Sequence, residues 1–224
     1  MNNPLPVREV LETFPALNLP GVAHTFVRRV PSVSVSHDKA EVLSLLQPWH
    51  AAAVDVLGFA QDHVFTAGQI HGGETMAITM ASPRWSPEVD GLMTNVPGVL
   101  LGIHTADCAP VYLVDPVHRA AALLHSGRKS TAAGITARTV RLMNQTYGTD
   151  AADLIVQIGP CIRPPLFEVD IASIIARDAI AAGVPSHQVH DCGTCTGKAV
   201  DRYYSYRVER GKTGRLLALL GLAE

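Results

Sequence analysis

Short apolar runs bounded by turn-forming residues dominate the middle of this chain. Runs of this length that are rich in Val, Leu, Ile and Ala and end in Gly, Pro or Asp are typical of buried β-strands. Asp115-Pro116-Val117-His118 predicts a tight turn between two of them. The pattern predicts five strands, at residues 99–103, 111–115, 120–124, 153–158 and 215–222.

Apolar residues recur at helical spacing elsewhere. The sequence predicts three helices, which begin after Asp38, Gly127 and Asp170. Asp38 and Glu41 form a predicted capping box, and Pro48 is expected to end the first helix. The second helix is predicted from the apolar spacing over 132–143, and Gly183 closes the third.

The remaining segments are predicted to be loops and turns. Prolines predict a loop over 82–87, Asp90-Gly91 predicts a turn, and residues 2–20, with four prolines, are expected to lie on the surface or to add an edge element. Strands mixed with helices, some of them joined by tight turns, indicate an α/β (α+β) protein. Its mixed sheets are expected to lie inside a covering of helices.

Composition narrows the classes of protein that fit. A chain of 224 residues that is 47% hydrophobic can bury the core of one domain, which we expect to span residues 1–224. Its net charge of −2 gives no electrostatic case for binding nucleic acid or an anionic membrane. The N-terminus lacks a signal peptide pattern, so we expect a cytoplasmic protein whose four cysteines are reduced.

Three potential metal ligands stand beside small residues at the ends of apolar runs. His71, Cys108 and His125 follow the runs that begin near Phe65, Val99 and Ala120. Two imidazoles and one thiolate suit zinc or copper, and a set of three ligands leaves a position for water or substrate. The alternative is a buried cysteine with two hydrogen-bonded histidines, and the residue types alone leave both open.

Other polar residues near these runs are candidates for binding substrate. Gly127-Arg128-Lys129-Ser130 would place free amides and two cations at a helix N-terminus, which suits phosphate but is also common on solvated helices. Asp107 is placed to act as a base or to orient Cys108, or to bind loop amides. Three further residues could hydrogen-bond a heterocyclic base or could equally be structural: Gln69, His104 and Tyr206.

The remaining cysteines carry weaker signals. Cys192-Gly193-Thr194-Cys195 has the spacing of a redox pair, but no strand precedes it to make a thioredoxin-like unit, so we expect a loop near the site. Cys161 is expected to be a small buried residue rather than a nucleophile.

Six motifs, taken together, resemble the YfiH-type laccase-domain family, also described as multicopper polyphenol oxidase-like and as purine nucleoside phosphorylases. The resemblance covers Gly21 to the C-terminus. The motifs are Gln69-Ile70-His71-Gly72, Asp90-Gly91-Leu92-Met93-Thr94, Thr105-Ala106-Asp107-Cys108-Ala109-Pro110-Val111, His125-Ser126-Gly127, Ile158-Gly159-Pro160-Cys161-Ile162, and Tyr204-Ser205-Tyr206-Arg207 followed by Thr213-Gly214-Arg215.

This resemblance implies a four-layer sandwich of two sheets flanked by helices, comparable to that of cysteine hydrolases. It implies zinc or copper at His71, Cys108 and His125, and phosphorolysis of adenosine, inosine, guanosine and methylthioadenosine with adenosine deamination as a side activity. Some members are described instead as hydrolases that edit peptidoglycan precursors. Two departures fall on the substrate side: the glycine- and serine-rich loop that usually follows the first strand is shortened here, with only Arg28 or Arg29 remaining, and Arg128 stands where a Trp is usual.

The resulting hypothesis is a metal-dependent purine nucleoside phosphorylase whose partners are a purine nucleoside and phosphate. Arg28 and Arg128 would hold phosphate, Asp107 or His104 would exchange the proton, and Gln69 and Tyr206 would contact the base. The alternatives are a cysteine hydrolase with Cys108 as the nucleophile, a copper oxidase, and a binding protein without turnover. A monomer and a homo-oligomer remain equally open.

Overall fold

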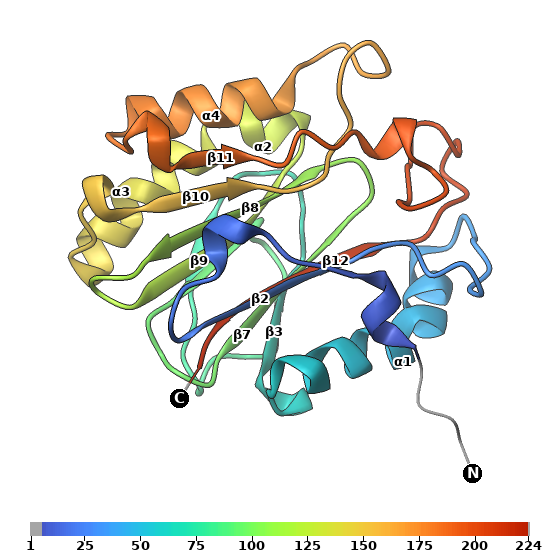
Figure 1. The fold of residues 1–224 in the computed structure, drawn as a ribbon, viewed down its shortest axis with the longest axis horizontal. Helices are drawn as coiled ribbons and strands as arrows, with labels where there is room; N and C mark the ends of the chain where they lie inside the picture. The colour runs from blue at the N-terminus through green and yellow to red at the C-terminus, as the bar shows by residue number, and fades with distance from the viewer. Residues whose placement is uncertain (1–5, 224) are drawn as a thin grey trace.

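The computed structural model describes residues 6–223 (Figure 1). Its α-helices are α1 (Lys39–Leu57), α2 (Arg128–Ala132), α3 (Ile135–Tyr147) and α4 (Ile171–Ala181). Its strands are β1 (Leu11–Glu12), β2 (Val22–Val27), β3 (Val64–Ala67), β4 (Thr75–Ala77), β5 (Trp85–Ser86), β6 (Gly91–Thr94), β7 (Leu100–Thr105), β8 (Ala109–Asp115), β9 (Ala120–Ser126), β10 (Ile155–Ile158), β11 (Val189–Asp191) and β12 (Leu216–Leu222). Short 3-10 helices are η1 (Val7–Val10), η2 (Pro15–Leu17), η3 (Gln61–His63), η4 (Ala151–Asp153), η5 (Ser186–Gln188) and η6 (Thr196–Lys198).

The strands form two mixed sheets of six strands each. The first has the order β1-β2-β12-β7-β3-β5 and the second the order β11-β10-β8-β9-β6-β4. Antiparallel pairs dominate the centre of each sheet, and the parallel pairs are β3 with β5 and β7, β10 with β11, and β4 with β6. The chain passes from the first sheet to the second between β7 and β8, so this connection lies where the two sheets meet.

Alternating side chains of the second sheet serve two cores. On β8, Tyr112 and Val114 pack into the core shared with the first sheet and α1, whereas Val111 and Leu113 face the core beneath α3 and α4. Successive residues of a strand point to opposite faces, so one apolar strand can fill both cores. The result is four layers, with α1 outside the first sheet and α3 and α4 outside the second (Figure 1). Within residues 6–223, no helix is long and apolar enough to cross a membrane.

The predicted mixed α/β architecture is confirmed, and so are the central strands. The runs at 99–103, 111–115 and 120–124 are β7, β8 and β9, and those at 153–158 and 215–222 are β10 and β12. The N-terminal segment supplies β1 at the edge of the first sheet, as expected for part of residues 2–20; residues 2–5 lie outside the described residues.

Pro48 does not end the first helix, contrary to the prediction. Helix α1 continues to Leu57 and buries Val42, Leu46 and Val54 against the first sheet. A proline in a helix interior costs about 3 kcal/mol, but burying several large apolar side chains contributes more than this. The predicted capping box is also only half correct, because Asp38 accepts from the amides of the first turn whereas Glu41 bonds the hydroxyl of Ser36.

The helix predicted after Gly127 is two helices, and the loop predicted over 82–87 contains a strand. Helix α2 ends at Ala132, because Gly134 has a φ of 72° in the left-handed region and α3 starts after it. Within 82–87, Trp85 and Ser86 pair with β3 as β5. A strand of two residues is too short for a hydrophobic pattern to reveal it.

Buried His24 on β2 makes the fold sensitive to acid. Its Nε2 accepts a hydrogen bond of 2.9 Å from the amide of Phe14, and the side chain is 6% exposed. Burial lowers the pKa of His24 from 6.5 to about 4. The neutral ring is therefore part of the folded state.

Between pH 6.5 and 4 the unfolded chain binds a proton at His24 that the folded chain does not, so stability falls as pH is lowered through this window. We expect this group to contribute a loss on the order of 3 kcal/mol by pH 4. In His24→Gln the slope of unfolding free energy against pH, measured by urea unfolding, should become shallower in this window. The exposed His187→Gln is the matched control, and an unchanged slope in His24→Gln would contradict this account.

Candidate metal-binding active site

The site lies where the chain crosses from one sheet to the other. Strand β7 of the first sheet is followed by Ala106, Asp107 and Cys108, and then by β8 of the second sheet. Asp107 has a φ of 87°, which turns the backbone sharply at this point. The register of β8 against β9 pairs Ala109 with Ser126, so Cys108 lies beside Gly127.

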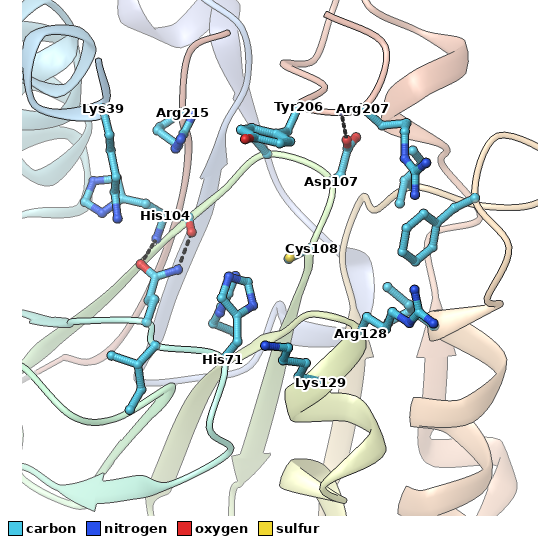
Figure 2. A pocket seen from close by; sticks show the side chains of 17 residues that line it. Lys39, His71, His104, Asp107, Cys108, Arg128, Lys129, Tyr206, Arg207 and Arg215 are labelled. Carbon is cyan, nitrogen blue, oxygen red and sulfur yellow. Dashed lines mark hydrogen bonds between the residues drawn. The ribbon is translucent and has the colours of Figure 1, made fainter. Parts of the chain in front are cut away.

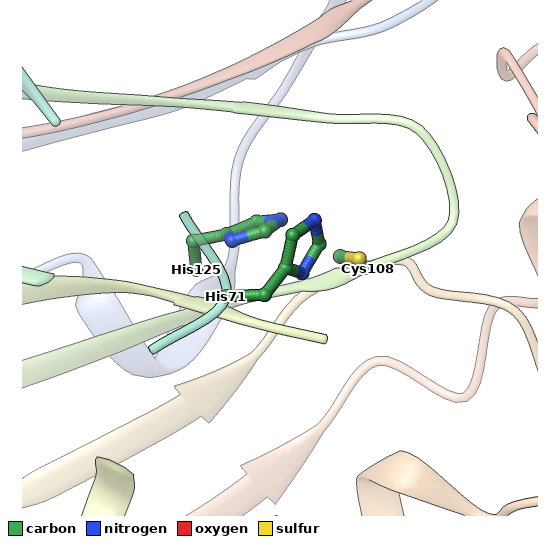
Figure 3. Close-up of side chains that lie close together, drawn as sticks. All are labelled: His71, Cys108 and His125. Carbon is green, nitrogen blue, oxygen red and sulfur yellow. The ribbon is translucent and has the colours of Figure 1, made fainter. Parts of the chain in front are cut away.

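Three side chains from distant segments converge there (Figure 3). Potential ligand atoms of His71, Cys108 and His125 all lie within 4.8 Å of one another, and the two imidazole centroids are 4.7 Å apart. A Cβ atom at Gly127 would lie 2.8 Å from both Cys108 Sγ and His71 Nδ1. A residue with a side chain at position 127 would therefore push Cys108 and His71 apart. Two imidazoles and one thiolate suit zinc or copper.

One buried carboxylate holds both histidines in place. Asp90, which lies just before β6, accepts hydrogen bonds from the amides of His71, Gly72 and Gly73 at 2.8, 2.6 and 3.1 Å. Its Oδ1 also lies 3.0 Å from Nδ1 of His125. Because Nδ1 of His125 faces Asp90, Nε2 is the nitrogen left for a metal ion.

These contacts set the charges of the cluster. Burial lowers the pKa of His125, but its hydrogen bonds to Asp90 and Cys108 outweigh burial and raise it to about 9. Burial raises the pKa of Asp90, but bonds from His125 and the three loop amides lower it to about 2. Burial and the neighbouring His125 lower the pKa of His71. Asp90 therefore carries a permanent negative charge directly behind the two imidazoles.

The cluster opens into a cavity of about 600 Å³ (Figure 2). This size suits a small organic ligand. Among the described residues, the cationic side chains that line it are Lys39, Arg128, Lys129, Arg207 and Arg215. The one acidic residue in that lining is Asp107. The cavity is therefore strongly positive in a chain whose net charge is −2.

Four of these five cations lie at two ends of the cavity, and Lys129 lies between them. In Figure 2, Lys39 and Arg215 lie on the left beside His104, and Arg128 and Arg207 lie on the right. Cys108 and His71 lie between the two groups. A ligand that contacts both ends must pass over the histidine and cysteine cluster.

Gln69 lines the cavity but its amide is already in use. The side-chain nitrogen donates to the carbonyl of His104, and the amide of His104 donates to Oε1 of Gln69 at 3.0 Å. Gln69 thus braces the loop of His71 against β7, in place of the base contact expected from the sequence. The His104 ring faces the cavity, and burial together with His50, Lys39 and Arg215 lowers its pKa well below the usual value.

Asp107 is likewise engaged by its own chain. Its Oδ1 accepts a bond of 2.7 Å from the hydroxyl of Thr196, and its Oδ2 accepts one of 2.7 Å from the amide of Arg207. The carboxylate therefore ties two loops to the sheet crossing, which is the loop-binding alternative raised for it from the sequence. Tyr206 lines the cavity and is 56% exposed.

Arg28 does not reach this cavity. It lies beside η1 and the edge strand β1, where its guanidinium donates to the carbonyl of Glu9 at 2.7 Å and lies 3.8 Å from Glu12. The prediction that Arg28 contacts phosphate in this cavity is therefore wrong, because Glu9 in η1 and Glu12 in β1 hold its guanidinium elsewhere. Arg128 does line the cavity, but α2 is a helix of only five residues, and the amide of Gly127 bonds Ser130. Side chains rather than a helix N-terminus supply the positive charge.

The other cysteines lie near the site without lining the cavity. The structure leaves Cys161, Cys192 and Cys195 free, and burial raises the pKa of Cys161 and of Cys192. The Cys192–Cys195 loop reaches the site through Thr196, the next residue, which bonds Asp107. This agrees with the interpretation of that segment as a loop near the site. The expectation that no strand precedes it is wrong, because β11 ends at Asp191, directly before Cys192.

Sequence reasoning missed several residues that the fold brings to the cavity. Lys39 opens α1, and Arg207 and Arg215 lie in the loop between η6 and β12, so no local spacing links them to His71. The sequence indicates Asp90 as a turn residue and as part of a family motif, and neither predicts that its carboxylate holds the loop of His71.

Fold and site together define the class: a four-layer mixed α/β protein with a histidine and cysteine cluster at the crossing between its sheets. The family model described as "Multi-copper polyphenol oxidoreductase laccase" matches residues 32–173 and 167–223. The chain belongs to this family, the laccase-like or YfiH family.

Relatives and solved structures agree with this assignment. "Purine nucleoside phosphorylase YlmD" of Geobacillus stearothermophilus is 30% identical over 75% of this chain and 75% of its own length. "Purine nucleoside phosphorylase" of Deinococcus radiodurans is 30% identical over 93% of both chains. The crystal structure of YlmD from Geobacillus stearothermophilus shares the fold, with a TM-score of 0.82 at 24% identity over 96% of this chain and 99% of that one.

The role of Asp90 is tested by Asp90→Asn. An amide cannot accept from all four donors, so we expect zinc to bind 10- to 100-fold more weakly, roughly, and the unfolding free energy to fall by about 2–4 kcal/mol. Asp115→Asn is the matched control, because Asp115 is also buried and bonds the ring of His118 at 2.9 Å away from the site. It should lose stability but keep zinc affinity. Unchanged zinc binding in Asp90→Asn would contradict the proposed role.

The ligand set is tested by elemental analysis. Protein purified without added metal is expected to carry about one zinc or copper ion per chain, and Cys108→Ala should lose most of it because the thiolate is one of three ligands. Cys192→Ala is the matched control, since Cys192 is a partly buried cysteine outside the cluster. Full metal retention in Cys108→Ala would remove Cys108 from the ligand set.

Proposed function

We propose that this protein is a purine nucleoside phosphorylase, which cleaves the bond between ribose and a purine with inorganic phosphate. The observation that carries the proposal is the strongly cationic cavity built around His71, Cys108 and His125. The names of relatives that are 30% identical over most of their length support it. A purine nucleoside and phosphate are the proposed partners, and the proposed unit is one domain over residues 1–224.

The reaction defines what the site must provide. A phosphate oxygen forms a bond to C1′ of the ribose while the bond from C1′ to the purine nitrogen breaks. The electron pair of that bond leaves with the purine, which then takes up a proton. The products are ribose 1-phosphate and free base. The site must therefore hold a phosphate dianion on one side of the sugar and stabilise negative charge on the departing base on the other.

The two cationic ends of the cavity suit these two tasks (Figure 2). We assign the purine to the end that contains His104, Lys39 and Arg215, where the two cations would stabilise charge on the leaving base. The neutral His104 ring carries one N–H, which could donate to a purine nitrogen. Tyr206 and Ile70, both more than half exposed, supply flat and apolar surface for the nucleoside.

His71, Cys108 and His125 would hold the metal ion, for which we propose zinc, with copper as the alternative. When bound, such an ion supplies a Lewis acid that polarises an oxygen atom. The donor set and the glycine at position 127 fit this group. Copper polyphenol oxidation, which the family's name suggests, receives less support, because multi-copper chemistry uses several copper sites and residues 6–223 bring together one such cluster.

The finer assignment follows the resemblance. We propose adenosine, inosine, guanosine and methylthioadenosine as substrates, with adenosine deamination as a side activity. The chemistry of the cavity favours no one of these purines, because Gln69, the one side-chain amide in its described lining, is engaged with the backbone of His104. Direct comparison of the four nucleosides would rank them.

A cysteine-type hydrolase is the second candidate, and one observation favours it. Cys108, His125 and Asp90 form a chain of thiol, imidazole and carboxylate in which the pKa of His125 is raised to about 9. An imidazole that holds its proton this firmly stabilises a neighbouring thiolate, which is the nucleophile of such enzymes. Editing of peptidoglycan precursors by amide hydrolysis is the substrate class that the resemblance attaches to this alternative.

The proposed reaction is tested by inosine turnover with and without phosphate. We expect hypoxanthine and ribose 1-phosphate to form only when phosphate is present, measured by chromatography and phosphorus NMR. His71→Ala, Cys108→Ala and His125→Ala should each lower kcat/KM by about two orders of magnitude or more, because each removes a group at the reacting centre. Cys192→Ala should behave as wild type.

Two other outcomes would contradict the phosphorylase. Amide or ester turnover without phosphate, abolished by alkylating Cys108 in metal-free protein, would establish the hydrolase. Nucleoside binding without turnover, unaltered when a glycine- and serine-rich loop replaces residues 28–36, would leave a binding protein.

A further inference from the structure

We propose that Arg128 and Arg207 form the subsite that binds inorganic phosphate, and that the carboxylate of Glu168 holds one donor of each arginine until phosphate in the cavity competes for them. The identity of the anion rests on the proposed function; the geometry of the subsite does not. Glu168 is thereby a residue that sets the affinity for phosphate.

Two arginines from distant segments converge on one carboxylate. Nη1 of Arg128, at the start of α2, lies 2.8 Å from Oε1 of Glu168. Nη2 of Arg207, in the loop before β12, lies 3.0 Å from Oε2 of the same side chain. Each carboxylate oxygen therefore has its own guanidinium. Two adjacent oxygens of a phosphate are spaced similarly to those of a carboxylate, so the same donors fit it.

The position of Arg207 does not depend on Glu168 alone. Its guanidinium carbon lies 5.0 Å from the centroid of the Phe167 ring, which also lines the cavity. The main-chain amide of Arg207 is fixed by Asp107 at 2.7 Å. This cation–π contact and this backbone anchor would keep the guanidinium near the subsite after the carboxylate leaves.

The two arginines face the cavity, whereas the carboxylate lies outside its lining. Arg128 and Arg207 line the same cavity as Cys108 and His125, and Glu168 is not part of that lining. Figure 2 shows both arginines on one side of Cys108. When Glu168 turns away into solvent, its two partners are left with unpaired donors beside the cluster.

Glu168 is easily displaced. The side chains of Arg128, Arg207 and Glu168 are 64%, 51% and 48% exposed. Ion pairs this exposed contribute little, because water solvates both partners almost as well. A phosphate dianion carries more charge than a carboxylate and offers further oxygens to Lys129, which also lines the cavity. The measured association constant for phosphate is then the intrinsic constant multiplied by the fraction of molecules in which both arginines are free of Glu168.

The test is calorimetric titration of the full chain with inorganic phosphate at constant ionic strength. In Glu168→Gln the competing charge is gone, so phosphate should bind about threefold more tightly or better. In Arg207→Gln it should bind roughly tenfold more weakly, because a charge-assisted contact is lost. The matched control is Glu74→Gln, which neutralises the carboxylate of another exposed pair, with Arg138, outside the cavity. Its phosphate affinity should equal that of wild type.

Two results would overturn the proposal. One is an unchanged or weaker phosphate affinity in Glu168→Gln while its thermal unfolding matches wild type. The other is loss of phosphate binding in Lys39→Gln but not in Arg207→Gln, which would place phosphate at the opposite end of the cavity. Inosine assays separate this proposal from the proposed function. Phosphate binding that responds to Glu168 without nucleoside turnover would overturn the function alone, and phosphate-dependent turnover whose KM for phosphate ignores Glu168 and Arg207 would overturn the subsite alone.

Discussion

The buried carboxylate of Asp90 is the constraint on which the site depends. It accepts hydrogen bonds from three backbone amides in the loop of His71 and faces the ring of His125. One side chain therefore fixes both imidazoles relative to each other. A charge with no solvent exposure is stable only when it is fully hydrogen-bonded, and these four contacts meet that requirement. The loop of His71 and the end of β9 therefore cannot move independently.

The second constraint is the short connection from β7 in the first sheet to β8 in the second. Tight packing of apolar strands on both faces of the second sheet leaves little freedom to β8 and β9, and their register places Cys108 beside Gly127. Cys108, directly before β8, and His125, near the end of β9, then meet at the connection between β7 and β8. The hydrophobic core thus determines where the reactive residues gather, and the loops around them supply the charge that surrounds a ligand.

Much of this could be predicted from the sequence because the signal is local. The apolar runs that form β7, β8 and β9 are short and bounded by turn residues, and the potential metal ligands His71, Cys108 and His125 stand at the ends of such runs. The charged cavity could not be predicted this way. Lys39 and Arg215 are far apart in the sequence, and a net charge of −2 averages over the whole surface and conceals a local excess of cations. Spacing also does not reveal which partner a single polar side chain finds. Gln69 contacts the backbone of His104, Asp107 accepts from the amide of Arg207, and Arg28 is held by η1 and β1.

The central claim is that phosphate, rather than water, attacks the sugar in this cavity. The most direct measurement is the reaction of inosine with unlabelled phosphate in water enriched in oxygen-18, followed by mass spectrometry of the sugar product at early times. The account predicts a ribose phosphate in which no oxygen comes from the solvent, because the new bond to C1′ is made by a phosphate oxygen. Free ribose that carries one solvent oxygen at C1′ would contradict it.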